Sequence, residues 1–150
     1  MKNIKLQSKQ TGFTLMELAI TIAIIAVLAA VFLPGLLQNQ EDAKASSALT
    51  QLQKDFPSAI SRQISRTNVC NGTTMTKANL ESRGMQPNGV FGDSWTVSYA
   101  ANVVTVTYPV TGASDAATVA TDLRTAMANS NNVASVGGTG NNVVIGYRCN

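Results

Sequence analysis

Few residue types in this sequence are suited to covalent chemistry. It has no histidine, and Cys70 and Cys149 are its two cysteines. A nucleophile activated by histidine is therefore excluded, and a zinc site built on two thiolates would need two carboxylates that no local spacing supplies. We expect no catalytic residue, no cofactor and no metal site, and a structural or binding protein rather than an enzyme.

The basic residues are unevenly distributed along the chain. Lys2, Lys5 and Lys9 all precede Gly12, whereas the remainder carries eight basic and eight acidic side chains. The pI of about 9.1 therefore reflects the first twelve residues more than the body. A body with balanced charge has no electrostatic footprint for a polyanion, so nucleic acid is disfavoured as a partner.

An apolar segment of 25 residues, 13–37, follows the three lysines. As a helix it would span roughly 37 Å, more than the ~30 Å hydrocarbon core of a bilayer. The lysines before it favour a cytoplasmic N-terminus, so a single span would export the C-terminal body. We therefore expect a membrane helix over 13–37 and an exported globular head over 38–150.

Glu17 is the one ionisable residue in this apolar segment. A carboxylate there costs roughly 2.5 to 3.5 kcal/mol on insertion scales, so it is rarely present without a partner or a role. Cleavage after Gly12 would create one, because the new α-amino group on Phe13 lies one helical turn before Glu17. The amine of a neighbouring chain would serve equally well, which makes the pair a candidate register device for assembly.

A conventional secretory signal also combines basic residues with an apolar run. Its best cleavage site here would be Leu28-Ala29-Ala30, which is a weak match, and the apolar stretch continues to Leu37. The segment therefore favours retention of the helix over its removal.

The stretch Gly12-Phe13-Thr14-Leu15-Met16-Glu17-Leu18 resembles the prepilin motif of type IV pilins and type II secretion pseudopilins. The resemblance implies that residues 1–12 are a cleaved leader, with Gly12 before the scissile bond. It also implies that Phe13 becomes the N-methylated first residue and that Glu17 acts in assembly. It implies three kinds of partner: a prepilin peptidase and N-methyltransferase, an inner-membrane assembly platform, and copies of the chain itself. The precursor would reside in the inner membrane and the product in an extracellular pilus.

Two prolines should perturb the helix that follows. Pro34 lies where many pilins carry a helix-loosening proline, and its ring clashes with the carbonyl of Ala30, so we expect a kink or a locally unwound stretch. At Pro57, either the long helix ends near Asp55 and a second begins, or one bent helix runs to about Thr67. A buried stripe is predicted at helical spacing: Ala45, Ala48, Leu49, Leu52, Phe56, Ile60 and Ile64.

The second half of the chain predicts a short helix, four strands and a further helix. The short helix is expected over 77–82, and strands over 95–100, 103–108, 133–136 and 143–148. Ser114 is the expected cap of a helix over 115–128. The fold class is therefore α+β, with a long N-terminal helix packed on a roughly four-stranded antiparallel sheet. This is the type IV pilin fold that the resemblance implies.

Cys70 and Cys149 are expected to form a disulfide, because export would carry them into an oxidising compartment. The loop encloses nearly the whole head, which is closer to type IVb pilins. The twelve-residue leader and the phenylalanine at position 13 are closer to type IVa, so the subclass stays open.

Two further motifs have alternative interpretations. The run 137–140 is glycine-rich but lacks the Gly-Lys-Ser/Thr ending of a phosphate loop, so a hairpin turn is favoured. Arg62 and Arg66 lie one helical turn apart and are suited to phosphate or to the acidic face of a partner, although such a pair is more often a solvated helix face.

Three functions share this N-terminal chemistry: the major subunit of a type IV pilus, a type II secretion pseudopilin, and a minor pilin for adhesion or DNA uptake. The major pseudopilin carries an acidic calcium loop near its C-terminus and usually lacks the disulfide. This chain has no acidic side chain after Asp122 and has both cysteines. The pilus subunit, with possible roles in motility or adhesion, is therefore favoured.

Overall fold

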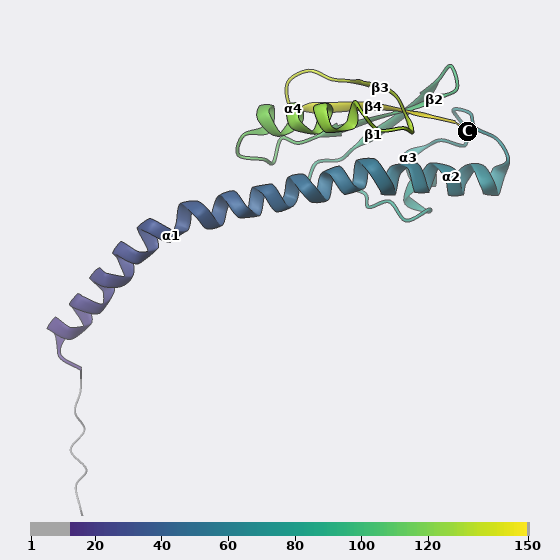
Figure 1. Cartoon of the computed structure of the whole chain (residues 1–150). Helices are drawn as coiled ribbons and strands as arrows, with labels where there is room; N and C mark the ends of the chain where they lie inside the picture. Colours follow the sequence, from purple (N-terminus) through teal and green to yellow (C-terminus); the bar gives the residue numbers. More distant parts are fainter. Residues whose placement is uncertain (1–12, 150) are drawn as a thin grey trace, which may run out of the picture. The chain divides into compact units, whose positions relative to one another are not determined.

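A helical stretch runs from Leu15 to Thr67 in three successive parts (Figure 1). They are α1 (Leu15–Thr50), a π-helical segment (Gln51–Asp55) and α2 (Phe56–Thr67). The computed structural model describes residues 13–149, so Gly12 and the predicted leader lie outside the described residues. Two units are distinguished, 1–38 and 39–150, and α1 contributes to both.

The π-helical segment precedes Pro57, which lies at the start of α2. Proline has no N–H to donate, and its ring crowds the carbonyl one turn earlier. The helix absorbs this by widening, since the Phe56 N–H donates to the carbonyl of Gln51 instead of to the residue four positions back. Of the two expectations for Pro57, the continuous helix to Thr67 is therefore confirmed.

Pro34 behaves differently from the expectation of an unwound stretch. α1 remains α-helical without interruption from Leu15 to Thr50, through Pro34 and Gly35. An unwound stretch at Pro34 is therefore wrong, and the kink stays a prediction.

Four antiparallel strands form one sheet in the order β1-β2-β4-β3. Their bounds are β1 Thr96–Ala100, β2 Val103–Pro109, β3 Val133–Gly137 and β4 Asn142–Arg148. The central pair is β2 and β4, in which Val104 lies opposite Tyr147 and Val106 opposite Ile145. The predicted α+β class and the four-stranded antiparallel sheet are confirmed.

The buried stripe of the long helix packs against this sheet. Ala48, Leu52, Phe56 and Ile60 are buried, as their spacing predicts, and Ala45, Leu49 and Ile64 are half-buried. Phe56 lies at the centre, with its ring centroid 5.0 Å from that of Trp95 and 6.3 Å from those of Tyr108 and Tyr147. Such aromatic contacts stabilise a core beyond the apolar area they bury.

Buried polar groups of this core are hydrogen-bonded to the helix or to nearby loops. The Tyr147 hydroxyl donates to the carbonyl oxygen of Leu52 at 2.7 Å, and the Tyr108 hydroxyl donates to Gln51 Oε1 at 2.8 Å. Burial raises the pKa of both phenols, so both remain neutral donors over the physiological range. These bonds fix the helix on the sheet at one register.

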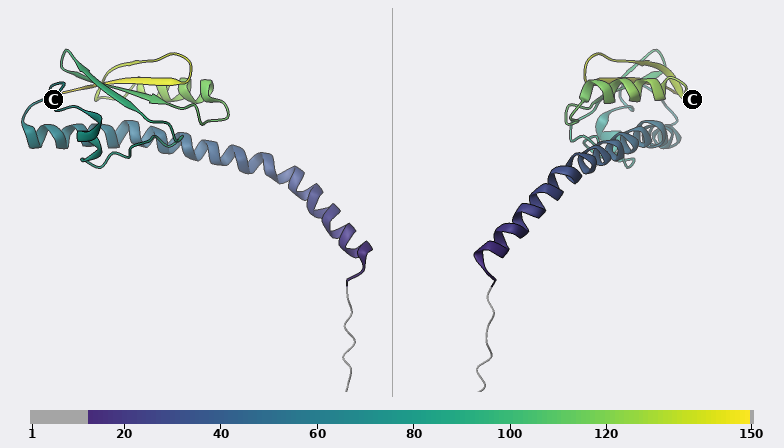
Figure 2. Two further views of the ribbon diagram at one scale, coloured as in Figure 1. Left: turned by 180° about the vertical axis from the view of Figure 1, so that it is seen from behind. Right: turned by 60° about the vertical axis from the view of Figure 1, so that its left-hand side comes forward.

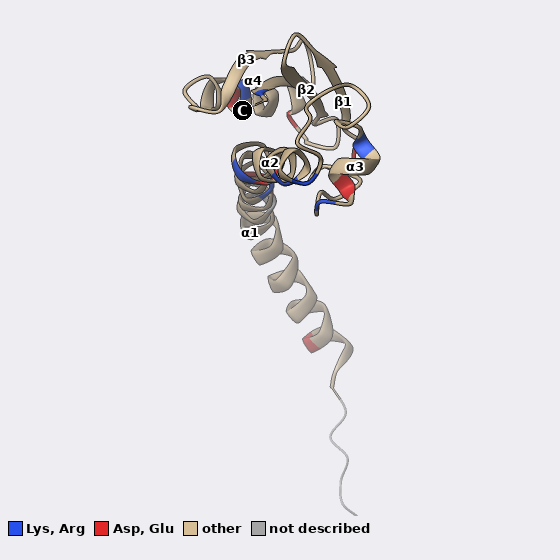
Figure 3. Cartoon of the chain, turned by 90° about the vertical axis from the view of Figure 1, so that its right-hand side faces the viewer, with Lys and Arg blue, Asp and Glu red and all other residues tan. Residues whose placement is uncertain are grey.

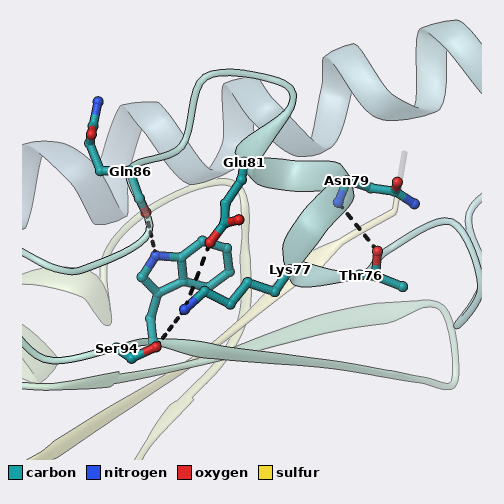
Figure 4. A network of polar contacts seen from close by, with 7 residues as sticks. Thr76, Lys77, Asn79, Glu81, Gln86 and Ser94 are labelled. Atoms are coloured by element: carbon teal, nitrogen blue, oxygen red, sulfur yellow. Dashed lines mark hydrogen bonds and ion pairs between the residues drawn. The ribbon is translucent and has the colours of Figure 1, made fainter.

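Two shorter helices complete the head, α3 (Lys77–Glu81) and α4 (Ala116–Met127). Thr76 caps α3 by accepting the Asn79 N–H, and Lys77 lies 5.0 Å above the ring of Trp95 and 3.8 Å from Glu81 (Figure 4). Figure 2 shows α4 beside the sheet within the head. Its buried residues Ala120, Leu123 and Met127 join the same core.

Candidate functional site

The first turn of α1 positions the residues that the sequence singles out. Thr14 precedes the helix, and its Oγ1 accepts a hydrogen bond from the Glu17 N–H at 3.2 Å. The Thr14 carbonyl accepts the Leu18 N–H at 3.1 Å. This is an N-cap, which satisfies one of the backbone donors that every helix start leaves free.

The cap places Glu17 in the first turn, where the positive end of the helix dipole favours a carboxylate. Its side chain is exposed and forms no salt bridge with any residue of the described range 13–149. Phe13 is 82% exposed, and in the uncleaved chain its nitrogen is an amide that carries no charge. Pairing between a Phe13 amine and Glu17 therefore requires cleavage first, and it stays a prediction.

An apolar surface surrounds this single carboxylate. The most apolar 18-residue window of the helix has a mean hydropathy of 2.7, and none of it is buried. By length and composition, the helix is able to cross a membrane. Its exposed large apolar side chains include Leu15, Met16, Leu18, Ile20, Ile22, Ile24, Ile25, Val27, Leu28, Val31, Phe32, Leu33 and Leu36.

The structure joins Cys70 and Cys149 by a disulfide. Cys70 follows the end of α2 after Asn68 and Val69, and Cys149 directly follows β4. Asn102, in the turn between β1 and β2, also holds this end of the chain: its carbonyl accepts the Cys149 N–H, and its side-chain amide donates to the Cys149 carbonyl. The last strand is thus tied covalently to the end of the long helix.

The other motifs take structural positions. The glycine-rich run is the turn between β3 and β4, as predicted, and Gly138 has a positive φ of 112° where a Cβ would meet the Asn142 carbonyl. Arg62 does not form an isolated pair with Arg66, because its Nη1 donates to the Arg83 carbonyl at 3.1 Å. Among the described residues, no group of three or more histidine, cysteine, aspartate or glutamate side chains is placed to hold a metal ion.

The expected cap of the helix after residue 114 is wrong by one residue. Asp115, rather than Ser114, caps α4 by accepting the Thr118 N–H. Ser114 instead binds Glu41 of α1: its N–H donates to Oε1 at 2.9 Å and its hydroxyl donates to Oε2 at 2.6 Å. No local pattern indicates this contact, since the two residues are 73 positions apart.

The Glu41–Ser114 contact should make stability depend on pH. The Ser114 hydroxyl and then its N–H lower the pKa of Glu41, so the folded state favours the carboxylate. This stabilisation is fully present above the ordinary glutamate pKa of about 4.3 and is lost as pH falls through the lower folded value. We expect Glu41→Gln to lose less thermal stability than the wild type between about pH 5 and pH 3.

The neighbouring exposed Asp42→Asn is the matched control for that measurement and should behave as the wild type does. Asp115 also has a lowered pKa, through its bond to Thr118, so acid sensitivity is reduced in Glu41→Gln and not abolished. Identical pH dependence in Glu41→Gln and the wild type would show that the contact adds nothing to stability.

The fold and this site together define a class of protein. A capped apolar helix with one carboxylate in its first turn, continued as the core helix of a four-stranded antiparallel head, has the architecture of a type IV pilin fold. The first part of this helix is exposed, whereas its later part buries one stripe against the sheet and exposes the opposite face.

Comparison with known proteins agrees with that class. Residues 7–33 match the family described as the prokaryotic N-terminal methylation motif. Over 49 residues the chain is 41% identical to the type II secretion system core protein G of Vibrio cholerae serotype O1, a match that spans 33% of this chain and 34% of that protein. No solved structure matches. The motif and this relative support the type IV pilin and pseudopilin family, and they do not distinguish its two branches.

Proposed function

We propose that this chain is the major structural subunit of a type IV pilus. It would be made as an inner-membrane precursor with residues 1–12 as leader, cleaved after Gly12 by a prepilin peptidase, methylated at Phe13 and polymerised by an inner-membrane assembly platform. Residues 13–37 would form the membrane span and then the filament core, and residues 38–150 the head. The match spans about a third of the relative's length, so the activity of that relative is not used to support this proposal.

The exposed apolar surface of α1 is the observation that carries the proposal. The large apolar side chains that the structure describes between Phe13 and Leu36 are each exposed to half or more of their area, which water does not favour. Lipid covers such a surface in the precursor. Outside the membrane the same surface needs an apolar partner, and helices of further copies supply one of matching length and composition.

Glu17 gives such a bundle a defined register. Its carboxylate is the one ionisable side chain of the segment, so in a packed helix core it requires a cation. The methylated amine of Phe13 on a neighbouring copy is the cation that processing creates. A neighbour displaced along the axis would leave both charges unpaired, which disfavours every other register.

A type II secretion pseudopilin is the second candidate, and the similarity to core protein G favours it. Two features of the head favour the pilus instead. The Cys70–Cys149 disulfide holds the C-terminal strand, and no acidic side chain follows Asp122 to build the calcium loop that resemblance to the major pseudopilin implies. A minor pilin for adhesion or DNA uptake is the third candidate, with less support from a head of nearly balanced charge.

Filaments sheared from the cell surface test the proposal. Electron microscopy of the sheared fraction, with mass spectrometry of its proteins, should find long filaments in which this chain is the most abundant subunit. Short filaments that depend on a secretion apparatus would favour the pseudopilin. A chain that stays in the membrane fraction as a monomer would contradict both filament proposals.

Processing makes a sharper prediction. The intact mass of the filament subunit should correspond to a chain that begins at Phe13 and carries one additional methyl group. A Gly12→Lys variant, which places a bulky charge beside the scissile bond, should accumulate at full length in the membrane. An assembled subunit that begins at Met1 or at Val31 would contradict the assignment of Gly12 and Phe13.

A further inference from the structure

Within the head, the two ends of the sheet are defined by different loops. The disulfide end holds the β1–β2 turn at Ala101–Asn102, with Cys149 hydrogen-bonded to Asn102. The loop end holds the β3–β4 turn and residues 110–115, where the Val110 N–H donates to the Asn141 carbonyl at 2.9 Å. Because β2 and β4 are antiparallel and pair along their full length, these two ends lie at opposite ends of the strands.

Arginines gather toward the disulfide end. Arg62 and Arg66 are exposed on α2, the helix that leads to Cys70. Figure 3 shows basic positions of the chain in blue, some of them on this helix. Arg83 joins them from the loop after α3, with its Nε donating to Gln63 Oε1 at 2.9 Å and its carbonyl accepting from Arg62. We define the basic end as Arg62, Arg66, Arg83 and Arg148.

These guanidinium groups have no carboxylate partner in the described part of the chain. The one salt bridge within residues 13–149 joins Lys77 to Glu81. Gln63 of α2, which accepts the hydrogen bond from Arg83, is buried and neutral. The basic end therefore presents positive charge that the head itself does not neutralise.

Carboxylates gather toward the loop end. Glu41 binds Ser114, Asp115 caps α4, and Asp93 accepts the N–H groups of Thr111 and Gly112. Asp42 is exposed beside Glu41 on α1. We define the acidic end as Glu41, Asp42, Asp93 and Asp115. Lys44 on α1 and Arg124, whose Nη1 donates to the Gly138 carbonyl in the β3–β4 turn, lower its net charge without reversing the sign.

We infer that the basic end of one head docks against the acidic end of a second copy in the filament. This inference rests on the proposed function. A head-to-tail contact between unlike surfaces is the interface type that continues into a helical filament, whereas a two-fold contact would place like charges together. Because the two charges nearly cancel within each head, copies attract end to end without strong overall repulsion.

A polyanion such as DNA is the other partner that four arginines would suit. The head favours a second copy instead, because the complementary acidic surface is present on the same chain in comparable size. Charge complementarity of this kind sets register and orientation more than total affinity. The expected defect on reversing it is therefore a loss of filament yield at a constant subunit level.

Charge reversal in the full chain tests the inference. Arg66→Glu and Asp42→Lys each place like charges at the contact, and each should lower the yield of sheared filaments by roughly tenfold. The combined Arg66→Glu/Asp42→Lys chain restores unlike charges in exchanged positions and should recover much of that yield. Ser98→Glu, which adds a charge in the middle of β1 and away from both ends, should assemble as the wild type does.

Processed subunit in the membrane fraction is measured for every variant, so that loss of folding is separated from loss of assembly. Normal filaments from both single reversals would overturn the inference while leaving the proposed function intact. So would impaired single reversals with no recovery in the combined chain. Normal filaments that lose only their retention on DNA would assign the basic end to nucleic acid. A wild-type chain that forms no filaments would remove the proposed function and this inference together.

Discussion

Glu17→Gln should yield a processed, membrane-embedded subunit that forms few or no filaments. Glutamine keeps the shape of the side chain but removes its charge, so the amine of a neighbouring Phe13 would be left in an apolar interior without an ion partner. Breaking a buried ion pair from one side costs about 3–5 kcal/mol, because the remaining charge is uncompensated. Repeated at every subunit, this cost is large enough to prevent growth of the polymer.

Insertion into the membrane should not suffer from the same change. The carboxylate itself opposes insertion by roughly 2.5 to 3.5 kcal/mol, so its removal makes partitioning easier. The Thr14 cap uses the backbone N–H of Glu17 and not its side chain, so the helix start is retained. Cleavage after Gly12 should persist, and the intact mass of the membrane-bound subunit checks it.

Glu81→Gln is the matched control, since it makes the same chemical change on α3 of the head. Its filaments should be as abundant as those of the wild type. Abundant normal filaments from Glu17→Gln, at wild-type subunit levels, would show that the carboxylate is dispensable and would contradict the register mechanism. Loss of the subunit from the membrane would likewise contradict the separation of insertion from assembly.

Removal of the disulfide should destabilise the head strongly. The bond closes a sequence separation of 79 residues, and the loop-entropy relation gives up to about 4–5 kcal/mol for a loop of this length. The double substitution Cys70→Ser/Cys149→Ser avoids a free thiol and removes the whole constraint. We expect a lower midpoint in urea for the purified chain in detergent, followed by the fluorescence of Trp95, which is 1% exposed in the fold.

Reductant provides the control for the disulfide experiment. It should lower the midpoint of the wild type toward that of the double variant and leave the double variant unchanged. Peptide mapping without reduction should recover the linked peptides of Cys70 and Cys149. Wild-type midpoints that are equal with and without reductant, or thiols that alkylate freely in folded filaments, would contradict this account of how β4 is held.

Local sequence patterns were sufficient to predict several parts of this fold. The apolar run with its single carboxylate, the helical spacing from Ala48 to Ile60 and the two β-branched segments around Ala101–Asn102 each depend on residues a few positions apart. Backbone geometry repeats over that range, so spacing alone indicates which side chains share a face. The predicted strands accordingly agree with the observed bounds within one residue.

Where two local structures were about equally compatible with the sequence, only the tertiary structure showed which one forms. Ser114 and Asp115 are both good helix caps, and the carboxylate of Glu41, 73 residues earlier, engages Ser114 and leaves Asp115 to cap α4. At Pro57 the sequence allowed an ended or a continuous helix. Packing of Leu52 and Phe56 against the sheet favours continuity, and the π-helical widening accommodates the proline.

The sequence by itself determined the motif from Gly12 to Glu17, the membrane-compatible helix and the α+β class. Each of these depends on the types and spacing of residues that are close together in the chain. Only the tertiary structure decided which groups the charged side chains contact. Arg62 donates to the backbone carbonyl of Arg83 rather than to an acidic side chain, and Glu41 accepts from Ser114. The fold brings these segments together, although no periodicity in the sequence relates them. A hydrogen bond or ion pair acts over a few ångströms of space, and distance along the chain does not predict that separation.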